Sequence, residues 1–343
     1  MAGLLRVVRA DKGAVLAVPD GGLVDEASEH PGVPVRVVVD RDGLLPVDDE
    51  GGRDAPTVGD WLTIDDEGAA RLQPRRTALV RDTAGRTSRV QALAANVDVV
   101  LVVEHLDPEP DLGRVERLLT LAWRSGAQPV VVLTKADLVP DPAGMAADVA
   151  AVALAVDVHA VSVVAGTGLD EVRRHVAPGV TLVVVGPSGA GKSTLVNALA
   201  GAEVMATGER REHDGRGRHT TTHRELIPLR DGAFLIDTPG LRGIGLVADA
   251  DALGTTFADV VELAERCRFR DCGHAREPGC AVRAALEAGE LSERRLASWR
   301  KLEREAAYQE RRTDARAAAQ EKARWKRITQ DHRQQVRGPG LSR

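Results

Sequence analysis

The chain has 343 residues, 43% hydrophobic and 28% charged, with a formal net charge of −5 at pH 7. This length allows two or three domains, and the composition is typical of a globular protein. No apolar run approaches the roughly 20 residues of a membrane span, and the N-terminus lacks the pattern of a secretory signal peptide. The composition therefore argues against a membrane or secreted protein, and we expect a cytoplasmic monomer that contacts no membrane.

Residues 1–75 carry the pattern of a small β-barrel. Short β-branched or alternating runs are separated by turn-forming clusters of Gly, Pro and Asp; these runs are RVVRA, AVLAV, VRVVVD, DWLTI and AARLQ. Such runs are typical of β-strands. Five strands in about seventy residues favour an OB-fold.

Residues 76–248 change in pattern. Apolar runs such as VDVVLVVE, PVVVLT, VHAVSVV and TLVVVG are typical of strands buried on both faces, and helical patterns such as RVERLLTLAWRSG lie between them. This alternation predicts an α/β domain with a doubly wound, mostly parallel sheet.

Residues 249–343 contain no further strand pattern. A Cys/His cluster comes first, and a long charged helix is expected from about Ser292 to Gln335. Residues 294–343 contain 15 Lys and Arg against 6 Asp and Glu, whereas residues 1–76 contain 9 against 15. The basic tail is therefore the natural contact for a polyanion such as RNA, although a solvated helix is an alternative interpretation.

The sequence TKAD at 134–137 follows a predicted buried strand. Asp137 could accept two hydrogen bonds from guanine, the stem of Lys135 could lie over the base, and Thr134 stands where common GTPases have Asn. The stretch VSVVAGTGL, which contains Ser162, resembles the GTPase loop that touches the guanine oxygen. An ordinary end of a strand is the alternative for so short a motif.

The sequence GPSGAGKS at 186–193 matches a phosphate-binding loop between a predicted strand and a helix. Its glycines allow backbone N–H groups to surround a phosphate. Lys192 is placed for the β- and γ-phosphates and Ser193 for Mg²⁺. At 45 residues after Lys192, LIDTPG supplies Asp237 for Mg²⁺ and Gly240 for the γ-phosphate.

The base-reading motif precedes the phosphate loop, whereas familiar GTPases have the reverse order. Ligand loops of a parallel α/β sheet lie at the carboxyl ends of the strands, whatever their order in the chain. The sequence therefore predicts a circular permutation. The residues expected to bind GTP or GDP are Thr134, Lys135, Asp137, Ser162, Gly186, Ser188, Gly189, Ala190, Gly191, Lys192, Ser193, Thr194, Asp237 and Gly240.

All three cysteines lie in a cluster with one histidine, with the spacing C-x4-C-x-H-x5-C. The members are Cys267, Cys272, His274 and Cys280. Three thiolates and one imidazole complete a tetrahedral Zn²⁺ shell, so we expect one structural zinc ion per chain. Buried cysteines without a metal are the alternative.

The order of these motifs resembles the ribosome small subunit-dependent GTPase A family. The matching stretches span residues 58–283 and are VGDWLTI, AANVDVVLVV, GPSGAGKSTLVNAL, GRGRHTTTHRELIPL, FLIDTPGLRGIGL and CRFRDCGHAREPGCAV. The resemblance implies a GTP hydrolase that binds the small ribosomal subunit and its rRNA, in part through the OB-fold. It also implies a role late in subunit maturation, with hydrolysis driving release.

The residue that positions the attacking water is not the usual one. Many GTPases have Gln directly after D-x-x-G, where this chain has Leu241. The resemblance implies that His219 takes this role; a loop histidine that touches solvent or RNA is the alternative. Either Thr221 or Thr222 is expected to meet Mg²⁺ and the γ-phosphate, which makes His219, Lys192, Thr221 and Thr222 the predicted catalytic set.

Two other functions remain open at this stage. An rRNA-binding scaffold with an occupied but catalytically idle nucleotide site is favoured only by Leu241, and an ATPase only by Thr134. Turnover of GTP and of ATP, with and without small subunits, separates these functions.

Overall fold

The structure is a computed structural model of the chain. It describes residues 3–11, 13–19, 34–48, 52–82, 90–205, 224–229, 232–237 and 249–311. Several predicted residues lie outside these ranges: His219, Thr221, Thr222, Gly240, Leu241 and the tail beyond position 311.

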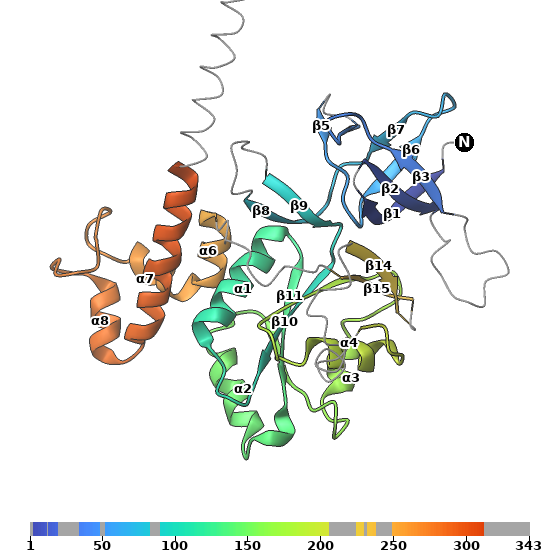
Figure 1. The fold of residues 1–343 in the computed structure, drawn as a ribbon. Helices are drawn as coiled ribbons and strands as arrows, with labels where there is room; N and C mark the ends of the chain where they lie inside the picture. Colours follow the sequence, from blue (N-terminus) through green and yellow to red (C-terminus); the bar gives the residue numbers. More distant parts are fainter. Residues whose placement is uncertain are drawn as a thin grey trace, which may run out of the picture.

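The N-terminal part is an antiparallel barrel of the OB type (Figure 1). Its main strands are β1 (Leu4–Asp11), β2 (Ala14–Pro19), β3 (Val35–Val38), β6 (Trp61–Ile64) and β7 (Ala70–Leu72). These confirm the five strands expected from the sequence. Two short strands were not expected, β4 (Leu45–Pro46) and β5 (Arg53–Asp54). Alternate apolar residues fill the interior; they are Leu5, Val7, Val15, Ala17, Val37, Leu45, Leu62 and Leu72.

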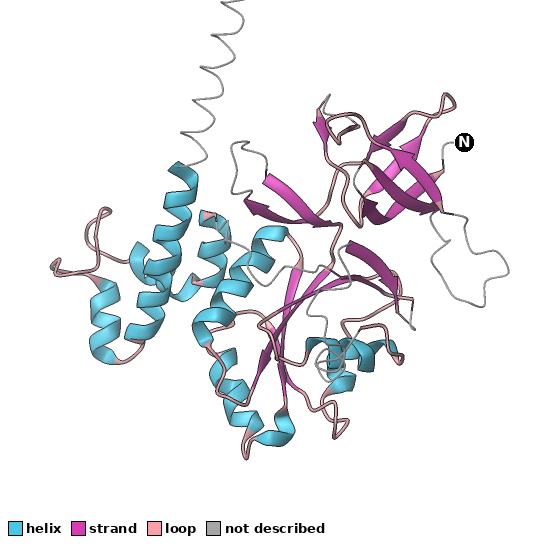
Figure 2. Cartoon of the chain, viewed as in Figure 1, coloured by secondary structure: helices cyan, strands magenta, loops and turns pink. Residues whose placement is uncertain are grey.

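The central sheet is mixed, with parallel strands in the order β12-β11-β10-β13-β15 and antiparallel β14 beside β15 (Figure 2). Their bounds are β10 (Val99–His105), β11 (Gln128–Thr134), β12 (Asp157–Ala160), β13 (Thr181–Val185), β14 (Arg224–Pro228) and β15 (Phe234–Asp237). The apolar runs in the sequence become these strands because both faces of the sheet are covered. The doubly wound prediction is confirmed.

Helices pack on both faces of this sheet. They are α1 (Leu112–Ser125), α2 (Pro142–Ala150), α3 (Leu169–Arg173) and α4 (Lys192–Ala200). One core joins α1 and α2 to the side chains of one face, such as Val100 and Val131. A second core joins α3 and α4 to the other face, which includes Val103 and Val132. The loops at the carboxyl ends of the strands are thereby fixed on a rigid support.

The barrel and the central sheet are continuous. Strand β1 pairs with β14, with Arg9 opposite Glu225 and Ala10 opposite Arg224. Arg6 Nη2 donates to Thr181 Oγ1 at 2.6 Å, and the Arg6 guanidinium lies over the Trp61 ring. The barrel is thus anchored to β13, the strand that leads into the phosphate loop.

A hairpin of β8 (Ala78–Asp82) and β9 (Val90–Ala95) follows the barrel and was not expected from the sequence. Gly59 approaches the end of β9 so closely that a Cβ there would lie 2.1 Å from the Ala95 carbonyl oxygen. With φ at +90°, this position favours glycine on both grounds. Asn96 Nδ2 also donates to the Gly59 carbonyl at 3.0 Å, which fixes the hairpin against the barrel.

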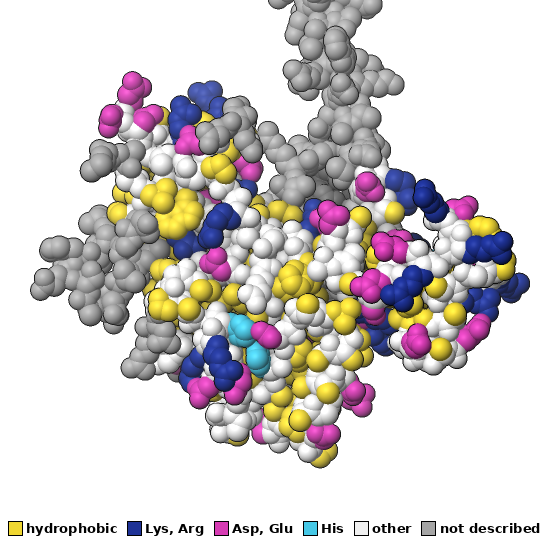
Figure 3. Space-filling model, turned by 180° about the vertical axis from the view of Figure 1, so that it is seen from behind, with side chains coloured by type: hydrophobic (Ala, Val, Ile, Leu, Met, Phe, Trp, Pro, Cys, Tyr) yellow, Lys and Arg dark blue, Asp and Glu magenta, His cyan; other side chains and the backbone are white. Residues whose placement is uncertain are grey.

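The C-terminal part is helical, with α6 (Ala250–Thr256), α7 (Ala258–Glu265), α8 (Ala281–Ala288) and a helix over 293–311. It has its own core around Phe257, Val260 and Leu302. Within the described ranges, no helix is long and apolar enough to cross a membrane. Basic and acidic side chains are interspersed with hydrophobic ones over the surface seen from behind (Figure 3).

Candidate nucleotide site and metal cluster

The predicted phosphate loop joins β13 to α4 and is built on glycine. Gly186, Gly189 and Gly191 have φ of 149°, 79° and 75°. A Cβ on Gly186 would lie 2.1 Å from the Val103 carbonyl oxygen of β10. The loop therefore needs glycine both for its conformation and for its approach to the neighbouring strand. Ser188 and Gly189 are exposed in it, whereas Ala190 is fully buried.

Lys192 is the first residue of α4, and its ammonium group lies over this loop. Nζ donates to the Gly186 carbonyl at 3.0 Å and also to the Pro187 carbonyl. Ser193 is half-buried in the first turn of α4 and Thr194 is exposed there. An ammonium and the N-terminal end of a helix thus meet at one loop, an arrangement that attracts a phosphate.

Thr134 connects the predicted base-reading motif to the phosphate loop. Its buried hydroxyl lies 2.8 Å from the Ala190 carbonyl oxygen and 3.2 Å from the Glu104 carbonyl oxygen. In the sequence Thr134 stands where common GTPases have Asn, and in the structure its hydroxyl is directed at backbone carbonyls. The two loops are therefore held together by a side chain at the end of β11.

Asp137 and Ser162, 25 positions apart, meet at the carboxyl ends of β11 and β12. Ser162 Oγ donates to Asp137 Oδ1 at 2.5 Å and accepts from the Ala165 N–H at 3.0 Å. Lys135 has a left-handed φ of 61° and its Nζ donates to the Asp107 carbonyl at 3.2 Å. The structure thus brings Lys135, Asp137 and Ser162 together at one edge of the sheet. The sequence predicts that these three residues bind the base.

Asp237 ends β15, which is parallel to β13 with Ile236 opposite Val183. Its half-buried side chain lies at the same sheet edge as the phosphate loop. Of the predicted magnesium ligands, Ser193 and Asp237 are in the described ranges and Thr221 is outside them.

The four predicted zinc ligands, Cys267, Cys272, His274 and Cys280, converge. Their ligand atoms all lie within 4.8 Å of one another. The Cys267 and Cys280 sulfurs are 3.8 Å apart, and they lie 3.5 Å and 3.6 Å from His274 Nδ1. Standard bond lengths in a tetrahedral zinc site give about 3.8 Å between two sulfurs and about 3.5 Å between sulfur and nitrogen. The donor set and its spacing therefore fit Zn²⁺.

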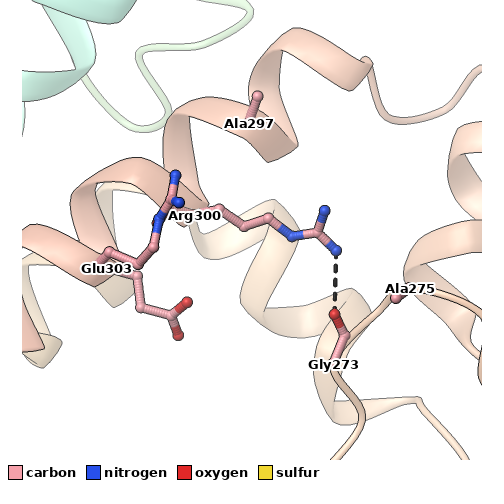
Figure 4. Close-up of a pocket in the computed structure, with 6 residues that line it drawn as sticks. Gly273, Ala275, Ala297, Arg300 and Glu303 are labelled. Atoms are coloured by element: carbon pink, nitrogen blue, oxygen red, sulfur yellow. Dashed lines mark hydrogen bonds between the residues drawn. The ribbon is translucent and has the colours of Figure 1, made fainter.

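The loop that carries His274 is held by two charged side chains. Arg300, from the helix over 293–311, donates to the Gly273 carbonyl at 3.2 Å (Figure 4). It also donates to the His274 carbonyl at 2.8 Å. The Glu277 carboxylate accepts from the N–H groups of Gly273 and Ala275. These and its own backbone N–H lower the pKa of Glu277 to about 2. The long helix therefore supports the cluster as well as extending from it.

Sequence reasoning missed the buried charges that join the parts of the chain. Asp60 is fully buried against Arg75, at 2.7 and 2.8 Å, and burial raises the pKa of this carboxyl. Glu116, on α1, is fully buried against Arg294 and Arg295 of the C-terminal helix. The sequence feature that could have predicted a buried charge is a lone acidic residue within an apolar helical pattern, such as Glu116 in RVERLLTL.

The comparisons with known proteins agree with this geometry. A family model described as RsgA GTPase matches residues 72–247. A protein of Streptomyces coelicolor named small ribosomal subunit biogenesis GTPase RsgA is 48% identical over 336 residues, which are 95% of this chain and 87% of that protein. A Listeria monocytogenes protein named small ribosomal subunit biogenesis GTPase RsgA 2 is 45% identical over 274 residues, 80% of this chain and 79% of its own.

Two solved structures share the fold. YjeQ from Thermotoga maritima matches with a TM-score of 0.59 and 23% identity, covering 90% of this chain and 99% of that chain. YloQ, described as a circularly permuted GTPase, matches with a TM-score of 0.58 and 22% identity, covering 90% and 96%. Both likenesses agree with the permuted order of the loops.

Proposed function

Because this chain belongs to the RsgA GTPase family, we propose that it hydrolyses GTP on the small ribosomal subunit and assists late maturation of that subunit. The relatives' printed names supply the class of substrate and partner. The observation that carries the proposal for this chain is the direct contact between Thr134 and Ala190. It joins a guanine-type motif to a phosphate loop that comes later in the chain.

Each described residue then has a task suited to its position. The N–H groups of the phosphate loop and the Lys192 ammonium hold the β- and γ-phosphates. Asp137 accepts from two donors on guanine that adenine lacks, and Ser162 orients this carboxylate. Ser193 and Asp237 would hold Mg²⁺, which would supply positive charge beside the phosphates. The water-positioning role stays with His219, outside the described residues.

Cys267, Cys272, His274 and Cys280 hold a structural Zn²⁺ ion. The set uses four protein ligands, so no coordination position remains open for substrate, which favours stability over catalysis. The His274 ring lies 5.9 Å from the Trp299 ring and its carbonyl accepts from Arg300. The ion would therefore stabilise the base of the helix over 293–311, which leads into the basic C-terminal residues, a sequence suited to rRNA.

Because of the permutation, the last segment of the nucleotide-binding domain leads directly into this C-terminal module. Chain positions 238–248 are all that separate Asp237 from Asp249, which caps α6. The nucleotide state at Asp237 therefore acts on the segment that enters the module. We expect the GTP form to bind the subunit and the GDP form to release it.

Co-sedimentation with purified small subunits tests this proposal. The protein is incubated with a non-hydrolysable GTP analogue, with GDP or without nucleotide, and the bound fraction is measured. Strong binding only with the GTP analogue is expected. Equal binding in all three states would contradict release by hydrolysis. An absence of binding in every state would contradict the proposal that the small subunit is the partner.

A further inference from the structure

A second cluster of metal-binding side chains lies on the edge of the central sheet, remote from the cysteines. Asp157 and His159 are two residues apart on β12, so their side chains leave the same face of the strand. His175 follows α3, and its backbone N–H donates to the Val172 carbonyl at 3.0 Å. Figure 3 shows histidine side chains meeting at the surface, beside acidic and basic ones.

The three side chains converge through their ligand atoms. The two Nε2 atoms of His159 and His175 are 3.0 Å apart, and His175 Nε2 lies 3.7 Å from Asp157 Oδ2. All three ligand atoms lie within 4.8 Å of one another. Two imidazole nitrogens bound to one ion are separated by about 3.0 Å at a right angle and about 3.4 Å in a tetrahedron, given bonds of about 2.1 Å. The pair therefore has the spacing of two ligands.

The contact between the two rings through their Nε2 atoms fits neutral imidazoles. Burial lowers the pKa of His159, and His175 lowers it further, against the opposite effects of Asp157 and Glu171. The Arg174 guanidinium also lowers the pKa of His159. Two protonated rings cannot face each other through Nε2, because both atoms would then be donors. Neutral nitrogens and an ionised carboxylate are the state a metal ion requires.

We propose that Asp157, His159 and His175 form a second metal site, for a divalent transition-metal ion such as Zn²⁺ or Ni²⁺. Two imidazoles and one carboxylate are ligands of intermediate softness that suit these ions, whereas the three thiolates of the other cluster favour softer metal ions. The His175 side chain is 15% exposed and that of Asp157 is 60% exposed. The remaining coordination positions therefore face solvent and are filled by water.

A bound ion would link two chain segments at the edge of the sheet. Chain positions 160–174 run from β12 through the loop of Ser162 to the end of α3, and the metal would join the two ends of this segment. An ion that binds only the folded chain raises its stability in proportion to the logarithm of its concentration. The prediction is a metal-dependent rise in Tm that needs both histidines.

Equilibrium dialysis of the full chain against Ni²⁺, after one equivalent of zinc per chain has been bound at the cysteine cluster, tests the proposal. Zinc and nickel are measured in the same sample, so exchange at the cysteines is seen as lost zinc. We expect the parent to bind one Ni²⁺ per chain and His159→Gln and His175→Gln to lose it. Because loss of an outer-shell partner alone costs about 10–100-fold in metal affinity, loss of a ligand should cost at least as much. Asp157→Asn should weaken binding less, and His105→Gln is the control that retains it.

Thermal unfolding of the same variants supplies an independent readout. Without Ni²⁺, the Tm of His159→Gln and His175→Gln shows that they fold. With Ni²⁺, the parent and His105→Gln should gain stability in full, Asp157→Asn in part, and the two histidine variants not at all. Equal nickel content in the parent and in both variants would overturn the proposal. Binding would then come from other groups, such as the histidines at 213, 219 and 223, and the pair would be a hydrogen-bonded one only.

Discussion

Glu116 and Arg295 form a buried ion pair between the α/β domain and the C-terminal helix, with 2.8 Å between Oε1 and Nη1. They are 179 positions apart in the chain, and their side chains are 0% and 3% exposed. Arg295 also donates to Asp259 at 2.9 Å and to the Thr256 carbonyl at 2.8 Å. One guanidinium thus joins α1, α6 and α7, so the module is held as a rigid extension of α1.

Arg295→Met should detach the C-terminal module. The substitution leaves the buried Glu116 carboxylate with Arg294 alone, and breaking a buried pair costs about 3–5 kcal/mol. The free energy of unfolding of the module should fall by this order, and protease should cut between 238 and 292 sooner. Denaturant unfolding followed with limited proteolysis measures both.

Arg283→Met is the matched control for that substitution. Arg283 pairs with Glu287 on an exposed face of α8 at 2.9 Å, where a pair is worth about 0.3–0.5 kcal/mol. If the two variants have the same stability, the buried pair does not hold the module.

Thr134→Val should weaken nucleotide binding through the phosphate loop. Valine keeps the shape but removes the hydroxyl, so the Ala190 carbonyl loses its donor at a cost of about 1–3 kcal/mol. A 10-fold or larger loss of GDP affinity is expected, since about 1.4 kcal/mol corresponds to tenfold. Titration with GDP measures this.

Thr255→Val serves as the control for the loss of a threonine hydroxyl. The Thr255 hydroxyl donates to the Asp251 carbonyl at 3.1 Å on the exposed face of α6. GDP affinity should not change in this variant. An unchanged affinity in Thr134→Val would mean that the hydroxyl does not position the loop.

The architecture could be predicted from the sequence because strong periodicity and motif spacing describe it. Runs such as VDVVLVV are stable only as strands that are covered on both faces. The motif GPSGAGKS predicts a turn between a strand and a helix. The hydroxyl of Thr134 could not be placed, because two backbone carbonyls and a base compete for it and only tertiary geometry decides. The short strands at 45–46 and 53–54 have no local pattern and form through pairing.

Cys272→Ser should reduce the zinc content, which we expect to be about one ion per chain in the parent. Loss of a ligand should loosen residues 255–290, whose core includes Cys267, Cys272 and Cys280. Metal analysis and limited proteolysis before and after chelation are the measurements. A parent protein without zinc, and with unchanged protease resistance after chelation, would contradict the structural site.

His219→Ala should retain GTP binding and subunit binding but lose stimulated hydrolysis. Leu241 is apolar at the usual water-orienting position, so the imidazole is the expected substitute. A drop of about 10²-fold in kcat is expected if this side chain positions the water. GTP affinity, co-sedimentation and kcat are measured on one preparation; a stimulated kcat within a few-fold of the parent would make the histidine a bystander.

The buried charges between domains could not be predicted, for a different reason. Asp60, Glu116 and Arg295 are types that usually lie at surfaces, and their partners are distant in the chain. In contrast, the convergence of the three cysteines with His274 could be predicted, because cysteine is rare in this chain and metal geometry limits the spacing. The histidine pair on β12 and after α3 had no such signal, since 16 positions separate the two residues.

Steady-state turnover of GTP and of ATP, with and without purified small ribosomal subunits, is the decisive measurement for this protein. A GTPase that acts on the small subunit should hydrolyse GTP slowly when free and much faster with small subunits, and it should hydrolyse little ATP. Both GTP rates should be lost in Lys192→Ala. Equal turnover of ATP would contradict the assignment of Asp137 to guanine. GTP turnover that does not rise with subunits would contradict a GTPase that acts there, and turnover that survives in Lys192→Ala would contradict the phosphate site.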